Sequence, residues 1–150
     1  MKVNLVSATD QDTDFLWRLH REVMRAYVEE LWGWHEEEQR ERFFEKLNLE
    51  NTQIIEMEGA PVGSIRVDRH PDHILLVNVA IVPAFQRRGI GKCLIKKLIR
   101  EADDSGLPLR LQVFRINPAH ELYRRMGFEI SNLSDTHFHM EYLPRREQML

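Results

Sequence analysis

The sequence predicts an α/β fold in which a mixed β-sheet is flanked by helices. Strand-like and helix-like hydrophobic patterns follow one another in the order strand, two helices, three strands, helix, strand, helix, two strands. The composition, with 43% hydrophobic and 30% charged residues, is ordinary for a globular protein. A chain of 150 residues is long enough to bury a substantial core. We therefore expect residues 1–150 to form a single layered domain.

The N-terminal part predicts one strand and two helices. Val3 and Leu5 alternate with polar residues, which is typical of a strand, and residues 9–14 are rich in helix-capping types. One helical face then carries six apolar residues: Phe15, Leu16, Leu19, Val23, Ala26 and Tyr27. Gly33 interrupts the helix. A second helix is expected to begin with the acidic turn at 36–38, where negative charge suits the helix dipole.

Three strands are expected in the middle of the chain, at 53–57, 61–69 and 73–82. Glu58-Gly59 and Pro71-Asp72 form the turns between them, and Pro83 ends the third strand because proline has no N–H for the ladder. The remaining elements follow in order. They are an amphipathic helix that begins near Gly89 and stops near Gly106, a strand at 109–114, a helix at 118–126 that Gly127 terminates, and strands at 128–130 and 136–143.

The loop before the amphipathic helix has the composition of an anion-binding site. The first turn of a helix has unpaired N–H groups and a partial positive charge, and glycine lets a ligand approach the backbone closely. A phosphate or pyrophosphate is the expected anion. A P-loop is excluded because Cys93 follows Lys92, and a dinucleotide fingerprint is excluded because Leu94 stands where a third glycine is needed.

Two motifs in this arrangement resemble those of the GNAT superfamily of acyl-CoA-dependent N-acetyltransferases. The pyrophosphate loop, Gln/Arg-x-x-Gly-x-Gly/Ala, is present as residues 86–91, and Asn-Pro-Ala-x-x-Leu-Tyr-x-x-x-Gly-Phe is present as residues 117–128. The final strand, HFHMEYL, is also similar, so the resemblance covers about residues 1–143. It implies a GNAT-like fold with a central, mostly antiparallel, twisted sheet of about seven strands flanked by four helices.

The resemblance also implies roles for individual residues, with acetyl-CoA (coenzyme A) as co-substrate. Asn117 would hydrogen-bond the pantetheine region and Tyr123 would lie near the thioester sulfur. Backbone groups of three strand residues would pair with the pantetheine arm: Ala80, Ile81 and Val82. Backbone N–H groups of six residues would hold the pyrophosphate: Arg87, Arg88, Gly89, Ile90, Gly91 and Lys92. The arginine side chains either reach the ribose phosphate or are solvated.

The implied chemistry is direct attack of an amine on the acetyl thioester. Tyr123 is the candidate general acid, because a phenol with a pKa near about 10 can protonate the departing thiolate. The general base is not assigned, because Leu75 occupies the strand position where some members of the family have a glutamate. The alternatives are a water chain to solvent or one of four residues near the strand: Asn78, which could position a water, His73, Asp68 and Glu30.

The resemblance implies that residues 24–39, which join the first two helices, form part of the acceptor pocket. Tyr27, Glu30, Trp32 and Trp34 would give it an aromatic and acidic lining that suits a cationic amine. The alternative is that the tryptophans pack beneath a corner between two helices while the glutamates are solvated. His137 and His139 share one face of the final strand, but no third ligand accompanies them, so no metal site is predicted.

These observations favour an enzyme that transfers acetyl from acetyl-CoA to a primary amine of a small cationic metabolite or a peptide. The alternative is a non-catalytic acyl-CoA-binding sensor or regulatory module of the same fold. A net charge of −3 disfavours nucleic-acid binding, and the absence of a signal region and of a long apolar stretch predicts a cytoplasmic protein without membrane partners. Cys93 is the single cysteine, so no internal disulfide forms. A homodimer through exposed strand edges is left open.

Overall fold

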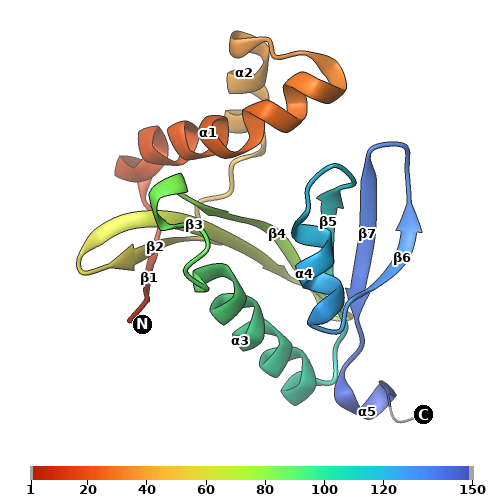
Figure 1. Cartoon of the computed structure of the whole chain (residues 1–150). Helices are drawn as coiled ribbons and strands as arrows, with labels where there is room; N and C mark the ends of the chain where they lie inside the picture. The colour runs from red at the N-terminus through yellow and green to blue at the C-terminus, as the bar shows by residue number, and fades with distance from the viewer. Residues whose placement is uncertain (1, 149–150) are drawn as a thin grey trace. The chain divides into compact units, whose positions relative to one another are not determined.

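The computed structural model describes residues 2–148 (Figure 1). Within these residues it contains the strands β1 (Asn4–Ser7), β2 (Thr52–Met57), β3 (Ala60–Arg69), β4 (Ile74–Ile81), β5 (Leu109–Phe114), β6 (Glu129–Leu133) and β7 (His137–Tyr142). The helices are α1 (Thr13–Trp32), α2 (Glu36–Lys46), α3 (Ile90–Ser105), α4 (Ala119–Arg125) and α5 (Arg145–Gln148), with 3-10 helices at Asp10–Asp12 and Pro83–Phe85.

The strands form a mixed seven-stranded sheet in the order β1-β2-β3-β4-β5-β7-β6. The pairs β1–β2, β2–β3, β5–β7 and β6–β7 are antiparallel, whereas β4–β5 is parallel. The parallel register joins Ile74 to Leu109 and Leu76 to Leu111. The expected α/β class with a mostly antiparallel sheet is therefore confirmed.

Two compact units are present in the described part of the chain. The first contains the residues up to Arg66 together with Asn78–Ile90, and the second contains Val67–Val77 together with the residues from Gly91 onward. The first unit holds α1, α2, β1 and β2. The second holds β5–β7, α4, α5 and almost all of α3.

Two details of the predicted elements are corrected. Ala26 was expected on the buried face of α1 but is exposed, whereas Trp17 and Val28 are buried. The reason is that α2 packs against the side of α1 that bears Trp17, as ring contacts with Phe43 show, and the buried stripe is rotated toward that side (Figure 1). The short helix α5 adds a fifth α-helix to the four expected.

A polar anchor holds the end of the second unit's chain against α3. The carboxylate of Asp103 accepts hydrogen bonds from the Tyr142 hydroxyl at 2.9 Å and from the backbone N–H of Arg145 at 2.7 Å. Tyr142 also packs on Phe128, which in turn packs on Tyr123 of α4. This chain of contacts fixes α4 over the sheet of its own unit.

Candidate functional site

The loop after β4 has the conformation of an anion-binding turn. Arg87 has a φ of 63° and Gly89 a φ of 81°, so two residues of a short loop adopt the left-handed region. That region is uncommon for a residue with a side chain, and such backbone is enriched at functional sites. The guanidinium carbon of Arg88 lies 4.6 Å above the Phe85 ring, which holds one cationic side chain beside the loop.

The first turn of α3 leaves room in front of its N–H groups. Ile90 is buried and anchors the helix, whereas Lys92 is exposed. A Cβ built on Gly91 would contact nothing within 4 Å, so packing within the protein does not require glycine there. Open space, a helix N-terminus and flanking cations together fit a pyrophosphate group.

The end of β4 is shaped by a close approach to β3. A Cβ on Gly63 would lie 2.3 Å from the carbonyl oxygen of Ala80, so no other residue fits without moving the strand. The N–H of Val82 donates to the Val62 carbonyl at 2.8 Å, and the side-chain amide of Gln86 donates to the Ile81 carbonyl at 2.9 Å. The loop is therefore tied back to the strand whose backbone was predicted to contact pantetheine.

Asn117 and Tyr123 lie in the second unit. The Asn117 side-chain oxygen accepts a hydrogen bond from the Ala119 N–H at 2.9 Å, and its backbone N–H donates to the Phe114 carbonyl at 3.0 Å. The side-chain oxygen of Asn117, one residue before the N-cap Pro118, thus accepts from the first N–H of α4, while its NH₂ group keeps two hydrogens for a ligand.

Tyr123 is a buried residue of α4 whose ring packs on Phe128, with centroids 5.9 Å apart. Burial raises the pKa of the Tyr123 phenol above its ordinary value, because desolvation disfavours the phenolate. No hydrogen bond within residues 2–148 engages its hydroxyl. A phenol that stays protonated and is not engaged by the protein suits proton donation.

In the acceptor-facing segment the structure gives Trp34 internal partners. Its indole N–H donates to Glu36 at 2.7 Å and its ring stacks on Trp17 at 6.3 Å, while the Arg25 guanidinium lies 5.7 Å from the ring centroid. Hydrogen bonds from Trp34 and then Arg21 lower the pKa of the Glu36 carboxyl. Trp34 therefore has partners from both helices at the corner between α1 and α2.

The other three predicted acceptor residues lie along the last turns of α1. Tyr27 is half-buried, Glu30 is exposed, and Trp32 is 56% exposed, which is high for a tryptophan. An exposed indole and an exposed carboxylate are each groups that attract a cationic partner.

The residues considered as a general base have varied surroundings. His73, at the turn before β4, has its Nδ1 atom 2.7 Å from Asp72 and stacks on His70 at 4.5 Å. It therefore lies at the opposite end of β4 from the Ala80–Val82 segment. Leu75 and Asn78 lie within β4, both partly buried. Asp68 is partly buried near the end of β3, and Glu30 belongs to α1.

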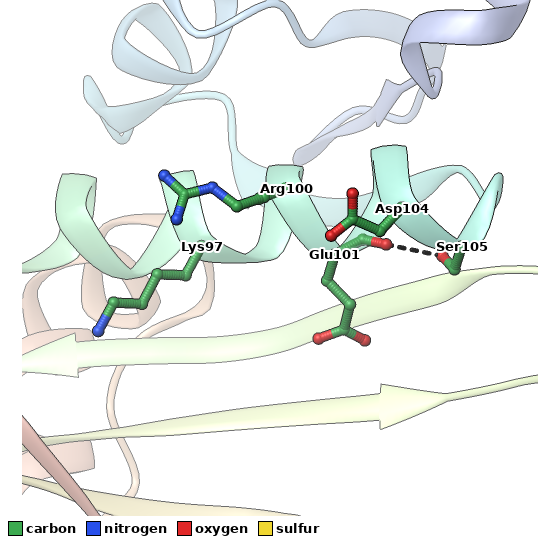
Figure 2. A pocket seen from close by; sticks show the side chains of 5 residues that line it. All are labelled: Lys97, Arg100, Glu101, Asp104 and Ser105. Atoms are coloured by element: carbon green, nitrogen blue, oxygen red, sulfur yellow. Dashed lines mark hydrogen bonds between the residues drawn. The ribbon is translucent and has the colours of Figure 1, made fainter.

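Two surface hollows are lined by none of the predicted coenzyme A residues. One, of about 420 Å³, lies over α3 and is lined by Lys97, Arg100, Glu101, Asp104 and Ser105. Figure 2 shows the side chains of Lys97 and Arg100 leaving the helix in different directions, so their charges do not converge on a ligand. The other, of about 580 Å³, is lined by His35 and four glutamates at the start of α2.

Sequence reasoning did not predict the structural roles of Gly63 and of the Gln86 side chain, which shape this site. A glycine inside a strand is the available signal for Gly63, because it often marks a close backbone approach. The side-chain bond of Gln86 to Ile81 had no local signal beyond its place in the loop motif. Among residues 2–148 no cluster of three or more His, Cys, Asp and Glu side chains could hold a metal ion, and no helix is long and apolar enough to span a membrane.

Comparison with known proteins identifies a single family. Residues 14–128 match the sequence profile of the Acetyltransferase (GNAT) family. The chain is 36% identical over 91 residues to the [ribosomal protein bS18]-alanine N-acetyltransferase of Haemophilus influenzae, which is 60% of this chain and 58% of that protein. It is 36% identical over 69 residues to the enzyme of the same name from Salmonella typhimurium, or 45% and 47% of the two lengths. The chain thus aligns with about half of each curated relative.

A solved structure shares the fold over almost the full length of both chains. It is the PaiA N-acetyltransferase of Thermoplasma acidophilum in complex with coenzyme A, at a TM-score of 0.74 and 19% identity, covering 95% of this chain and 99% of that one.

Proposed function

Because the chain belongs to the Acetyltransferase (GNAT) family, we propose that it moves the acetyl group of acetyl-CoA to a primary amine. The observation that supports this most is the backbone at residues 86–91, where left-handed Arg87 and Gly89 precede an open helix N-terminus. Backbone N–H groups in such a turn can bind a diphosphate group, and coenzyme A contains one.

The acceptor is the N-terminal amine of a peptide or protein. The curated relatives are named for acetylating an alanine of ribosomal protein bS18, which favours this amine over a small cationic metabolite. An α-amino group has a pKa of about 7.7–8.0, so roughly a tenth of it is already neutral at pH 7. Exposed Trp32 and Glu30 on α1 attract the positive charge of such a substrate.

The reaction proceeds by direct transfer. The neutral amine attacks the thioester carbonyl, the C–N bond forms, and the C–S bond breaks. The departing thiolate takes a proton from the Tyr123 hydroxyl, which burial keeps protonated at neutral pH. The free NH₂ group of Asn117 is the proposed donor to the pantetheine arm, and the N–H groups of residues 87–92 are the proposed donors to the pyrophosphate.

The test is release of free thiol from acetyl-CoA in the presence of defined amines. The panel contains peptides with a free N-terminal alanine, the same peptides with a blocked N-terminus, lysine peptides with a blocked N-terminus, and polyamines. We expect turnover with the free N-terminal peptides and none with their blocked counterparts.

Two negative outcomes have different meanings. If no amine of the panel releases thiol but calorimetry shows tight coenzyme A binding, the protein would be assigned as an acyl-CoA sensor and not as an enzyme. If there is neither thiol release nor coenzyme A binding, the loop at 86–91 does not hold a diphosphate.

A further inference from the structure

A histidine lies at the carboxyl end of β5, where the Asn117–Tyr123 segment begins. In sheets with parallel strands, ligands bind outside the carboxyl ends of those strands, and β4 and β5 are the parallel pair here. Phe114 is the last residue of β5, and its carbonyl accepts the Asn117 N–H. Its partner in β7 is His137, whose ring lies 4.6 Å from the Phe114 ring.

The His137 ring is oriented by its neighbour in sequence. Its Nδ1 atom lies 2.8 Å from the Thr136 hydroxyl. The Thr136 backbone is held in turn, because its carbonyl accepts the Arg115 N–H at 2.9 Å and its N–H donates to the Ser134 hydroxyl at 3.3 Å. No other hydrogen bond from residues 2–148 reaches the ring, so Nε2 is available to a substrate or water.

The surroundings keep His137 neutral at physiological pH. Desolvation, and then the charge of His139, lower the pKa of its imidazole below the ordinary value. The other charged groups on the elements around it include Asp135 in the turn before β7 and Glu129 of β6. They also include Arg115, whose guanidinium donates to the Ser134 carbonyl at 3.1 Å, and Glu141, which is engaged by Arg110 at 2.8 Å. No carboxylate of the described chain pairs with the ring to stabilise its cation.

We propose that His137 is the general base of the acetyl transfer, with Thr136 as the residue that positions its ring. This inference rests on the proposed function. The Thr136 hydroxyl can accept from Nδ1–H or donate to Nδ1. We take the first direction, in which the Nε2 lone pair accepts a proton from the acceptor ammonium, directly or through one water.

The protons balance in this scheme. The ammonium gives its first proton to His137 Nε2, which later releases it to solvent. Tyr123 protonates the thiolate, and the proton lost from nitrogen as the tetrahedral adduct collapses to the amide restores the phenol. The products are the acetamide, free coenzyme A thiol and one proton.

Two other histidines are weaker candidates on geometry. His120, in the first turn of α4, meets the Phe138 ring at 5.1 Å, and no side chain of the described residues hydrogen-bonds its ring. His139 is opposite Gln112, two residues farther from the carboxyl end of β5. His137 alone among the three combines the strand-end position with a side-chain hydrogen bond that orients its ring.

The decisive measurement is kcat against pH with a saturating N-terminal alanine peptide. We expect the wild-type kcat to be flat between about pH 7 and 8. In His137→Gln it should fall about 100-fold at pH 7 and rise about tenfold per pH unit, because hydroxide must then remove the proton. Thr136→Val should give an intermediate loss of kcat and should change the pH at which kcat falls on the acid side of the profile. Thr136→Ser, which keeps the hydroxyl, should have the wild-type profile. Added imidazole should recover activity in His137→Ala.

The matched control is His120→Gln, which should keep the wild-type profile. The inference is overturned if His137→Gln retains a flat profile at near wild-type rate, or if His120→Gln acquires the steep one. Calorimetry with coenzyme A verifies that each variant is folded and binds. Absence of turnover in the wild type would overturn the proposed function and this assignment together, whereas turnover with an unchanged His137→Gln profile would overturn this assignment alone.

Discussion

At the scale of single residues, two buried tyrosines have hydroxyls in different surroundings. The Tyr142 hydroxyl donates to Asp103 at 2.9 Å, whereas no hydrogen bond of the described residues engages the Tyr123 hydroxyl. A hydroxyl that the fold uses contributes to stability, and one that the fold does not use is free for chemistry.

We therefore predict that Tyr123→Phe lowers activity but not stability, and that Tyr142→Phe lowers stability but not activity. Tyr123→Phe should lower kcat about 100-fold while coenzyme A affinity and the free energy of unfolding stay close to wild type, because the variant loses a proton donor that is not a structural bond. Tyr142→Phe should keep kcat and lose about 1 kcal/mol of stability. Thiol release and urea unfolding measure the two effects, and an active Tyr123→Phe enzyme would remove the phenol from the mechanism.

Asn117 combines a structural and a predicted ligand-binding role, which substitution can separate. Asn117→Asp keeps an oxygen for the first N–H of α4 but loses the NH₂ donor, so coenzyme A affinity should fall about tenfold at nearly unchanged stability. Asn117→Ala loses both groups and should also lose about 1 kcal/mol of stability. Calorimetry and thermal unfolding distinguish these outcomes. Unchanged affinity in Asn117→Asp would leave the residue with its structural role alone.

At the scale of secondary-structure elements, the contact of β3 with β4 sets the backbone predicted to face pantetheine. Gly63→Ala would bring a Cβ within 2.3 Å of the Ala80 carbonyl, so the strand must move. We expect coenzyme A affinity to fall at least tenfold and stability to fall by about 1–3 kcal/mol.

The control for Gly63→Ala is Gly59→Asn in the turn of the β2–β3 hairpin. Gly59 has a φ of 79° and open space around its Cβ position, and asparagine tolerates this backbone. Calorimetry of both variants should show a loss in Gly63→Ala alone. Equal affinities would mean that β4 adjusts without affecting its ligand-facing groups.

The junction of α1 and α2 makes stability depend on pH through His20. This residue packs between Trp17 and Phe43, and burial lowers the pKa of its imidazole below 6.5. As pH falls below about 6.5, the His20 imidazole becomes protonated in the unfolded chain but stays neutral in the folded protein. The free energy of unfolding therefore decreases until the pH has passed below the pKa of His20 in the folded state.

His20→Gln should therefore reduce the loss of stability between pH 7.5 and 5.5. The lowered pKa of His137 acts in the same direction, so the dependence should become smaller rather than vanish. Urea unfolding at the two pH values measures it. His35→Gln, an exposed position at the start of α2, is the control and should retain the full dependence. An unchanged slope in His20→Gln would contradict the assignment.

At the scale of the whole molecule, ligand binding should stabilise the fold by mass action. Coenzyme A at 100 times its dissociation constant should add about 2.7 kcal/mol to the free energy of unfolding. For a chain of this length that corresponds to a rise in Tm of about 5–10 °C. Differential scanning calorimetry measures the rise. Adenosine, which lacks the diphosphate, is the control ligand and should produce little shift.

The helices and strands were predictable over most of the chain because their signals are local. The acidic turn at 36–38 begins α2 as expected, Glu58-Gly59 forms the turn between β2 and β3, and Gly127 follows the end of α4 with a φ of 104°. The short helix α5 was missed because four polar residues carry no periodic apolar pattern.

The sequence by itself determined the order of elements, the anion-binding composition of residues 86–92 and the family motifs, because capping, periodicity and glycine placement act within a few residues. The tertiary structure alone decided which side of α1 is buried, that Trp34 bonds to Glu36 within the corner, that Gly63 meets Ala80, and that His137 lies opposite Phe114. Most of these contacts join residues distant in sequence, since strand register and helix packing set them. No local pattern specifies them.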